Sequence, residues 1–238
     1  KMKGMYNIKY GDIQDLENFF IYNPNTVSFM VEPIQGEAGV IIPPRNYLED
    51  VRYLCNKYNV LMILDEVQTG LGRTGTLCNY HYSSIQPDLL ILGKALSGGY
   101  YPISAVLGNK EIMGVLTPGT HGSTFGGNPL ACAIANASVD VILKERLIEN
   151  SYKKGCLFRN ELNLMKNKYI KDIRGMGLLN AIETFEPKYA EEIHQNLLKE
   201  KILTKITHEN KIRISPPLII NKNQMNILLE KFKKALIL

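Results

Sequence analysis

Two short apolar runs, each followed closely by a charged side chain, constrain this sequence more than any other feature. Leu61-Met62-Ile63-Leu64 precedes Asp65, and Leu89-Leu90-Ile91-Leu92 precedes Gly93 and Lys94. Runs of this length between polar segments are typical of strands in a parallel sheet that is buried on both faces. Because the carboxyl ends of parallel strands meet at one edge, where open α/β folds bind ligands, we expect Asp65 and Lys94 at a ligand site.

A carboxylate and a primary amine at one sheet edge are the groups that pyridoxal 5'-phosphate (PLP) chemistry requires. The carboxylate pairs with the pyridine nitrogen, and the amine forms a Schiff base with the aldehyde. Each residue alone has a simpler interpretation: an Asp at a strand end usually caps a helix or anchors a loop, and a Lys there usually lies in solvent. Their pairing ahead of Ser97-Gly98-Gly99 favours the cofactor interpretation.

Composition excludes several classes of protein. The 238 residues suffice for one large domain or two smaller ones, and the formal net charge of +5 comes from 28 basic residues spread along the chain. Without a basic block that carries aromatics we expect no nucleic-acid partner, and no apolar run reaches the roughly 18 residues of a membrane span. The four cysteines and four histidines lack disulfide, CxxC or zinc-site spacing, so we expect reduced thiols and no metal.

The first half of the chain alternates between strand and helix patterns. Strands are expected at residues 26–31, 60–64, 89–92 and 103–107. Between the first two, a helix is expected to begin at Asn46, with Glu49 in the position of a capping box. Its apolar face would be formed by Leu48, Val51, Cys55 and Tyr58. This alternation predicts a mostly parallel α/β sheet, and we assign residues 1–133 to this domain.

The second half has an α+β pattern, which we assign to a smaller domain at residues 134–238. Asn128 and Pro129 are a good cap and first residue of a helix whose predicted face is Leu130, Ile134, Ala137 and Val141. Helices are expected at 134–167, 187–200 and 222–236, and strands at 178–183 and 212–215. The last helix would be capped by Asn221 and Gln224, with its apolar face formed by Met225, Leu228, Leu229, Phe232 and Leu236.

The segment Gly70-Leu71-Gly72-Arg73-Thr74-Gly75 matches the GxGxxG pattern of dinucleotide-binding folds. In those folds the pattern directly follows the first strand of a βαβ unit and opens a helix. Here Glu66-Val67-Gln68-Thr69 intervenes, and no amphipathic helix pattern follows. We therefore predict a flexible loop and no nicotinamide site.

Six ordered segments together are far more specific than any one of them. They are 32–37 (EPIQGE), 65–70 (DEVQTG), 93–99 (GKALSGG), 121–129 (HGSTFGGNP), 174–178 (RGMGL) and 212–217 (IRISPP). From about residue 27 to the C-terminus the sequence resembles the class III PLP-dependent aminotransferases. Within that class the nearest resemblance is to the ornithine aminotransferases, and the acetylornithine aminotransferases share most of the segments. The resemblance implies fold type I of PLP-dependent enzymes, with the large domain incomplete here and an α+β small domain at the C-terminus.

The resemblance also implies roles for individual residues. Lys94 would be the Schiff-base lysine that moves the proton, and Asp65 would hold the pyridine nitrogen. Gln68 would lie by the ring's phenolic oxygen. Ser123 and Thr124 would bind the cofactor phosphate of a neighbouring subunit, which implies at least a homodimer. Without the resemblance, these two residues would be interpreted as capping hydroxyls of a Gly-rich turn.

The resemblance further implies that Glu37 and Arg213 govern the choice of substrate. In ornithine aminotransferases the matching arginine binds the α-carboxylate of 2-oxoglutarate, and the matching glutamate neutralises that arginine while ornithine is bound. An arginine fork binds a carboxylate bidentately, and a paired glutamate masks it. Either residue alone would be interpreted as part of a surface salt bridge worth under about 1 kcal/mol.

The function that follows from the resemblance is transfer of the δ-amino group of L-ornithine to 2-oxoglutarate, giving glutamate 5-semialdehyde and glutamate. The alternatives are an aminotransferase for acetylornithine or another ω-amino acid, and a non-catalytic relative with the same fold. The family normally carries some two hundred further N-terminal residues, so we expect this chain to be the C-terminal portion of a longer protein. We expect a cytoplasmic location, or the mitochondrial matrix if a presequence precedes residue 1.

Overall fold

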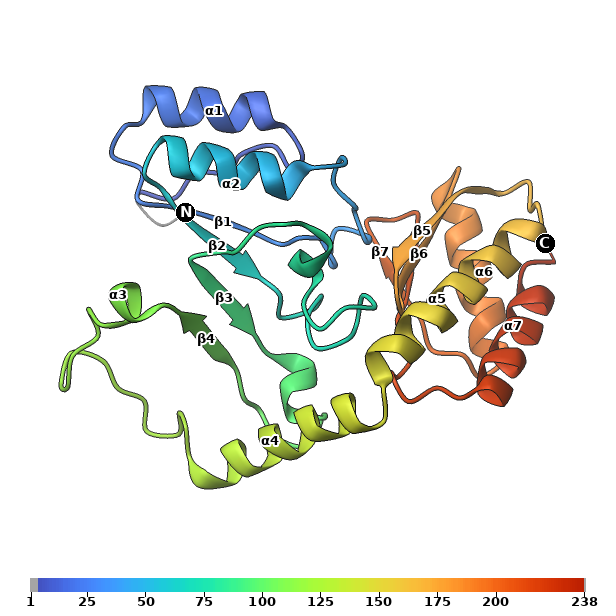
Figure 1. Cartoon of the computed structure of the whole chain (residues 1–238). Coiled ribbons are helices and arrows are strands. Elements are labelled where there is room, and N and C mark those ends of the chain that lie inside the picture. The colour runs from blue at the N-terminus through green and yellow to red at the C-terminus, as the bar shows by residue number, and fades with distance from the viewer. Residues whose placement is uncertain (1–3, 238) are drawn as a thin grey trace.

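Within residues 4–237, which the computed structural model describes, the chain forms two four-stranded sheets (Figure 1). The first contains β1 (Ser28–Val31), β2 (Leu61–Asp65), β3 (Leu89–Leu92) and β4 (Ala105–Gly108), in that order. β1, β2 and β3 are mutually parallel, and β4 runs antiparallel to β3. The mostly parallel sheet predicted from the two apolar runs is therefore confirmed.

Two helices lie together on one side of this sheet: α2 (Tyr47–Lys57) packs against β2, and α1 (Ile13–Tyr22), which the sequence analysis did not predict, packs against α2 (Figure 1). The predicted apolar face of α2 is largely confirmed, because Leu48, Val51 and Cys55 are buried. Its predicted capping box is wrong. Asn46 adopts a left-handed conformation (φ 64°) and its side chain makes no capping hydrogen bond, whereas a side-chain cap needs extended backbone.

Short elements complete the first region. One 3₁₀ turn, Asn79–Tyr82, lies between β2 and β3, and another, Lys94–Ser97, follows β3. A short helix, α3 (Lys110–Met113), follows β4. No helix in residues 4–237 combines the length and the apolar character needed to cross a membrane.

Two helices make up the region that the sequence predicted to be helical over 134–167. α4 (Pro129–Lys144) ends at Glu145, and α5 (Leu147–Leu164) begins after Arg146, whose φ of 54° breaks the helical path. A left-handed residue of this kind is a common way to end a helix. The predicted start of α4 is confirmed, since the Asn128 side chain accepts a hydrogen bond from the Ala131 N–H at 3.0 Å. The proposed domain boundary at 133/134 falls inside α4 and stays a prediction.

The predicted apolar face of α4 is not its buried face. Ala131, Ala135 and Ile142 are buried, whereas Leu130 and Val141 are 58% and 43% exposed. The helix packs against the 3₁₀ turn that begins at Lys94, and its Ser138 hydroxyl donates to the carbonyl of Ala95 at 2.9 Å. A close approach to a backbone turn selects the side of the helix that carries small residues, which explains the difference.

The second sheet has the order β5-β6-β8-β7 and is antiparallel throughout. Its strands are β5 (Ile170–Met176), β6 (Leu179–Thr184), β7 (Lys205–Thr207) and β8 (Lys211–Ile214). α5, α6 (Pro187–Lys199) and α7 (Lys222–Ala235) cover one face of it (Figure 1). The capping box of Asn221 and Gln224 and the buried face predicted for the last helix are both confirmed, while β5 and β7 were not predicted.

The glycine-rich segment 70–75 joins the two sheets and is not a flexible loop as predicted. The Arg73 guanidinium donates to the carbonyls of Leu178 (3.2 Å) and Pro216 (2.6 Å), and the Leu178 N–H donates to the carbonyl of Arg73 (2.9 Å). A β-carbon added at Gly177 would lie 2.4 Å from the carbonyl carbon of Thr74, and one at Gly155 would lie 1.8 Å from the carbonyl oxygen of Gly177. Three backbone segments therefore pack directly on each other, and their hydrogen bonds fix the segment.

Candidate active site

Asp65 and Lys94 lie at one edge of the large sheet, as the sequence predicted. Asp65 is the last residue of β2 and is paired in register with Ile91 of β3, whose carbonyl accepts from the N–H of Glu66 at 3.0 Å. β3 ends shortly beyond Ile91, and Lys94 begins the 3₁₀ turn that follows, with a φ of 44°. The two parallel strands thus deliver an acid and an amine to the same rim.

Both side chains at this rim keep polar atoms free. One oxygen of Asp65 accepts from the Val67 N–H at 3.0 Å, and within residues 4–237 its carboxylate has no other hydrogen-bond or ion-pair partner. The exposed ammonium group of Lys94 likewise has none in the described chain. A free carboxylate oxygen and a free primary amine on adjacent strand ends are the donor set that a pyridinium nitrogen and an aldehyde require. The residues present therefore fit PLP.

Glu32 adds a third charged group that the sequence analysis did not assign. It directly follows β1, and half-burial raises the pKa of its carboxyl group. The nearby charge of Asp65 raises that pKa further and Lys94 lowers it, so the fields of all three groups overlap. Its carboxylate also accepts from the Gly36 N–H at 3.0 Å, which fixes the start of the next turn. The sequence held the signal, because Glu32 ends the first strand as Asp65 ends the second.

A second polar cluster gathers four side chains from three parts of the chain: Glu37, Gln68, Lys205 and Arg213. One carboxylate oxygen of Glu37 accepts from Arg213 Nη1 and, at 3.2 Å, from Gln68 Nε2. The other pairs with the ammonium group of Lys205 at 2.8 Å. The structure therefore brings together Glu37, Gln68 and Arg213, which the resemblance had singled out, and adds Lys205.

This cluster keeps Glu37 ionised. Hydrogen bonds from Lys205 first, and then from Arg213 and Gln68, lower the pKa of the Glu37 carboxyl group to about 2. At neutral pH the arginine is therefore masked by a charged carboxylate, as a reversible ion-pair mask requires.

Gln68 links the cluster to the rim. It lies in the segment that directly follows Asp65, and its amide contacts Glu37. Gly36 makes this approach feasible, because a β-carbon there would lie 1.7 Å from the Gln68 side-chain oxygen. Gln68 thus connects the polar cluster around Glu37 to the strand end that carries Asp65.

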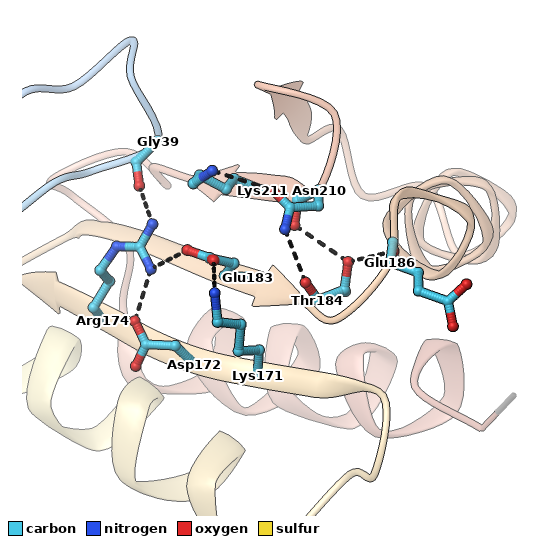
Figure 2. A network of polar contacts seen from close by, with 9 residues as sticks. All are labelled: Gly39, Lys171, Asp172, Arg174, Glu183, Thr184, Glu186, Asn210 and Lys211. Atoms are coloured by element: carbon cyan, nitrogen blue, oxygen red, sulfur yellow. Dashed lines mark hydrogen bonds and ion pairs between the residues drawn. The ribbon is translucent and has the colours of Figure 1, made fainter.

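The turn that carries Glu37 is held on the small sheet by Arg174 of β5 (Figure 2). Its guanidinium donates to the carbonyl of Gly39 at 2.8 Å, as Figure 2 shows. It also donates to the carbonyl of Val40 at 2.9 Å. The same group is bonded to the carboxylates of Asp172 at 2.7 Å and Glu183 at 2.8 Å. Because both acids flank it, the guanidinium is fixed at the point where it grips the turn.

Apolar contacts with β6 also hold the turn that carries Glu37. The side chain of Val40 is buried in a small cluster with Ile34, Leu179 and Ala181. A pair of backbone hydrogen bonds between Gln35 and Ile41 closes the base of the turn. The backbone around Glu37 is therefore fixed, although its side chain remains 57% exposed.

Ser123 and Thr124 lie apart from these groups. Both are exposed, and the Ser123 hydroxyl accepts from the Gly126 N–H at 3.0 Å. Within the described chain neither side chain bonds to Asp65, Lys94 or Gln68, so their role stays a prediction. Residues 4–237 also contain no group of three or more His, Cys, Asp or Glu side chains that could hold a metal ion.

Known proteins match this chain along nearly its whole length. The profile of the family described as Aminotransferase class-III matches residues 8–236. The chain belongs to the class III aminotransferases. The predicted resemblance and the predicted fold, fold type I of PLP-dependent enzymes, are thereby confirmed.

Individual class III relatives resemble the chain closely. A mitochondrial ornithine aminotransferase of Drosophila melanogaster is 50% identical over 236 residues, which are 99% of this chain and 54% of that protein. An acetylornithine aminotransferase structure from Elizabethkingia anophelis is 48% identical with a TM-score of 0.94, covering 98% of this chain and 60% of its own. A Toxoplasma gondii ornithine aminotransferase, crystallised with partial PLP occupancy at its active site, is 42% identical with a TM-score of 0.95 over 99% and 56% of the two chains. The chain thus spans about half the length of the curated relatives it matches.

Lys205 and Arg174 are site residues of this class III chain that sequence reasoning missed. Lys205 lies on the three-residue strand β7, too short to give a pattern. Arg174 opens one of the six segments that carried the resemblance, so the motif was visible. Its hold on the Glu37 turn was not visible, because that contact joins residues far apart in the sequence.

Proposed function

We propose that the protein containing this chain is a PLP-dependent aminotransferase that moves the δ-amino group of L-ornithine to 2-oxoglutarate in a two-step ping-pong cycle. The products are glutamate 5-semialdehyde and glutamate. One observation carries the proposal: a masked arginine, Arg213 paired with Glu37, adjoins a rim that offers a free amine and a free carboxylate. The names of the Drosophila and Toxoplasma relatives point to the same amino donor.

The rim residues would perform the chemical step. When bound, PLP withdraws electrons from the reacting carbon of the substrate. Asp65 would hold the pyridine nitrogen in its protonated form through its free carboxylate oxygen. The Lys94 amine would carry the proton to and from the substrate carbon, a task that needs a flexible basic group beside the reacting atoms.

The cluster residues would let one site take two unlike substrates. The reacting carbon of 2-oxoglutarate carries a carboxylate, whereas the reacting δ-carbon of ornithine carries only hydrogens besides its amino group, so a bare arginine would pair with the first substrate and stay an unpaired cation beside the second. With Glu37 on Arg213 the arginine is neutralised, and with Glu37 withdrawn its fork is free for a carboxylate. Gln68, which contacts Glu37, would orient the ring's phenolic oxygen next to this switch.

The cofactor phosphate would be bound in part by a second subunit. Ser123 and Thr124 are exposed, and within residues 4–237 their side chains make no hydrogen bond to the rim residues of their own chain. We propose that they serve the partner's site in a homodimer. Sedimentation of the full-length protein is expected to give a dimer or a multiple of it, and an active monomer would contradict this assignment.

Two experiments on the full-length holoenzyme test the proposed function. Borohydride reduction followed by peptide mapping is expected to place a pyridoxyl group on Lys94. L-Ornithine labelled with ¹⁵N at the δ position is expected to transfer its label to glutamate when 2-oxoglutarate is the acceptor. A reduced cofactor on another lysine, or ¹⁵N label that stays with the product derived from ornithine, would refute the assignment.

N-Acetylornithine is the second candidate donor, supported by the 48% identical acetylornithine aminotransferase. Single-turnover rates with the two donors decide between them. A holoenzyme that bound PLP and converted neither donor would be the non-catalytic relative.

The location of the protein is a separate proposal. One relative is named as mitochondrial, and we propose the cytoplasm or the mitochondrial matrix as the location of this protein. Fractionation of cells that make the full-length protein distinguishes the two.

A further inference from the structure

Two cations lie directly opposite each other on the small sheet. Lys205 of β7 and Arg213 of β8 are paired in register, so their side chains project from the same face. Like charges directly opposite each other on adjacent strands are unfavourable unless an anion lies between them. Glu37 is that anion, and it bonds to the two cations with different carboxylate oxygens.

The charges in this cluster do not balance. Two cations share one resident carboxylate, which leaves one positive charge in excess. One additional carboxylate would produce two neutral pairs. The arrangement therefore has the charge of a receptor for one more carboxylate.

We propose that Lys205 is a positioning residue that sets substrate specificity: it retains the Glu37 carboxylate when the carboxylate of the dicarboxylate substrate takes Arg213. Glu37 would turn from a bond with both cations to a bond with Lys205 alone. This inference rests on the proposed function and adds a residue to its switch.

The surroundings favour a movement of side chains only. Arg174, whose bond to Gly39 is shown in Figure 2, fixes the backbone of the Glu37 turn together with the buried Val40. The side chains of Glu37 and Lys205 are 57% and 59% exposed, so both have room to rotate. Because the pKa of Glu37 is about 2, the carboxylate leaves Arg213 as an anion and needs a cation to receive it.

Removing this receiver has a defined consequence. Without Lys205, a displaced Glu37 carboxylate would remain unpaired beside the incoming carboxylate, and the two anions would repel each other. Binding of the dicarboxylate should then weaken by about tenfold, the size of effect that loss of one charge-assisted contact produces.

The test uses Lys205→Met in the full-length holoenzyme. Glutarate, an unreactive dicarboxylate, is titrated by calorimetry, and the two half-reactions are followed separately by stopped-flow absorbance. We expect glutarate affinity to fall about tenfold and the ratio of the 2-oxoglutarate rate to the ornithine rate to fall by a similar factor. Lys205→Arg should restore both readouts, because it returns the cation.

Lys188→Met is the matched control, since Lys188 lies on α6, which packs on the same small sheet, and pairs with Glu186 at 2.9 Å instead of with a cluster residue. It should leave glutarate affinity and the ratio of rates as in the parent enzyme. Unchanged affinity and ratio in Lys205→Met, or equal losses in both half-reactions, would overturn the inference while leaving the proposed function intact. A parent enzyme that bound no glutarate and converted neither substrate would overturn the proposed function, and with it this inference.

Discussion

The two halves of the site are built in opposite ways. At the rim of the large sheet, Asp65 and Lys94 keep polar atoms free of protein partners within residues 4–237. In the cluster against the small sheet, Glu37, Gln68 and Arg213 are bonded to one another. Under the proposed function, the groups that would react with the cofactor are left available, and the groups that would distinguish two substrates are bonded to their neighbours.

This contrast follows from how each half is made. Parallel strands that end side by side deliver the rim residues, with little need for further support. The cluster depends on a turn after β1, which Arg174 of β5 holds on the small sheet, and on the antiparallel strands β7 and β8 near the C-terminus. The rim should therefore control the rate of both half-reactions, and the cluster should control the balance between them.

The largest effect is expected at the rim. Lys94→Ala removes the amine that carries the proton, so both half-reactions should slow by about 10³-fold or more. Stopped-flow absorbance of the full-length holoenzyme with each substrate measures the two rates. A variant that lost only one of the half-reactions would break the division between rim and cluster, and Lys110→Ala, on the exposed α3, serves as the control.

Arg213→Gln should separate the two halves most clearly. It removes the fork that binds the dicarboxylate, and loss of one partner of a charged pair costs about 2–5 kcal/mol, or roughly 30- to 5,000-fold in affinity. The kcat/KM for 2-oxoglutarate should fall by a factor in this range, and the kcat/KM for ornithine should change much less. Equal losses for both substrates would assign Arg213 to the common machinery.

The junction between the two sheets should affect stability more than specificity. Burial lowers the pKa of Arg73 to about 10, yet its guanidinium donates to the carbonyl of Leu178, between β5 and β6, and to that of Pro216, just after β8. Arg73→Met should lower the free energy of unfolding by about 3 kcal/mol, measured by urea denaturation. Arg146→Met, which breaks an exposed pair with Glu149, should change it by less than about 1 kcal/mol.

The smallest effect concerns pH. Because the pKa of Glu37 falls from 4.5 to about 2 on folding, its ion pairs stabilise the folded state above pH 4.5 and lose that contribution as the pH falls toward 2. The difference in urea midpoint between the parent and Glu37→Gln should be constant from pH 8 to 5 and shrink below that. A difference that changed between pH 8 and 6 would show that Glu37 titrates as a neutral-pH switch.

Local patterns predicted the rim and failed for the cluster. The apolar runs of β2 and β3 fix where Asp65 and Lys94 emerge, and α7 carries both its cap and its apolar face within one segment. The roles expected for Glu37 and Arg213 came from resemblance, since no periodicity relates residues so far apart. Lys205 was out of reach because only the register of β7 with β8 places it opposite Arg213.

The prediction of a flexible loop at residues 70–75 was wrong for a different reason. Glycines in sequence are typical of mobile loops, and nothing local indicates that other backbone will pack against them. Only the folded chain shows that Gly177 approaches this segment and that Arg73 bonds across to the second sheet. The buried face of α4 was mispredicted by the same mechanism, because a neighbouring turn selected its small residues.

The stacked backbone at Gly155 and Gly177 also determines how this protein can be damaged by mutation. Every missense change at a glycine codon adds at least a β-carbon, and neither position has space for one. These two positions therefore tolerate no replacement: a side chain at Gly177 must push the small sheet away from segment 70–75, and one at Gly155 must push α5 away from the backbone of Gly177. A screen of random variants should find loss of function here from replacements as slight as alanine, far from any group that touches a substrate.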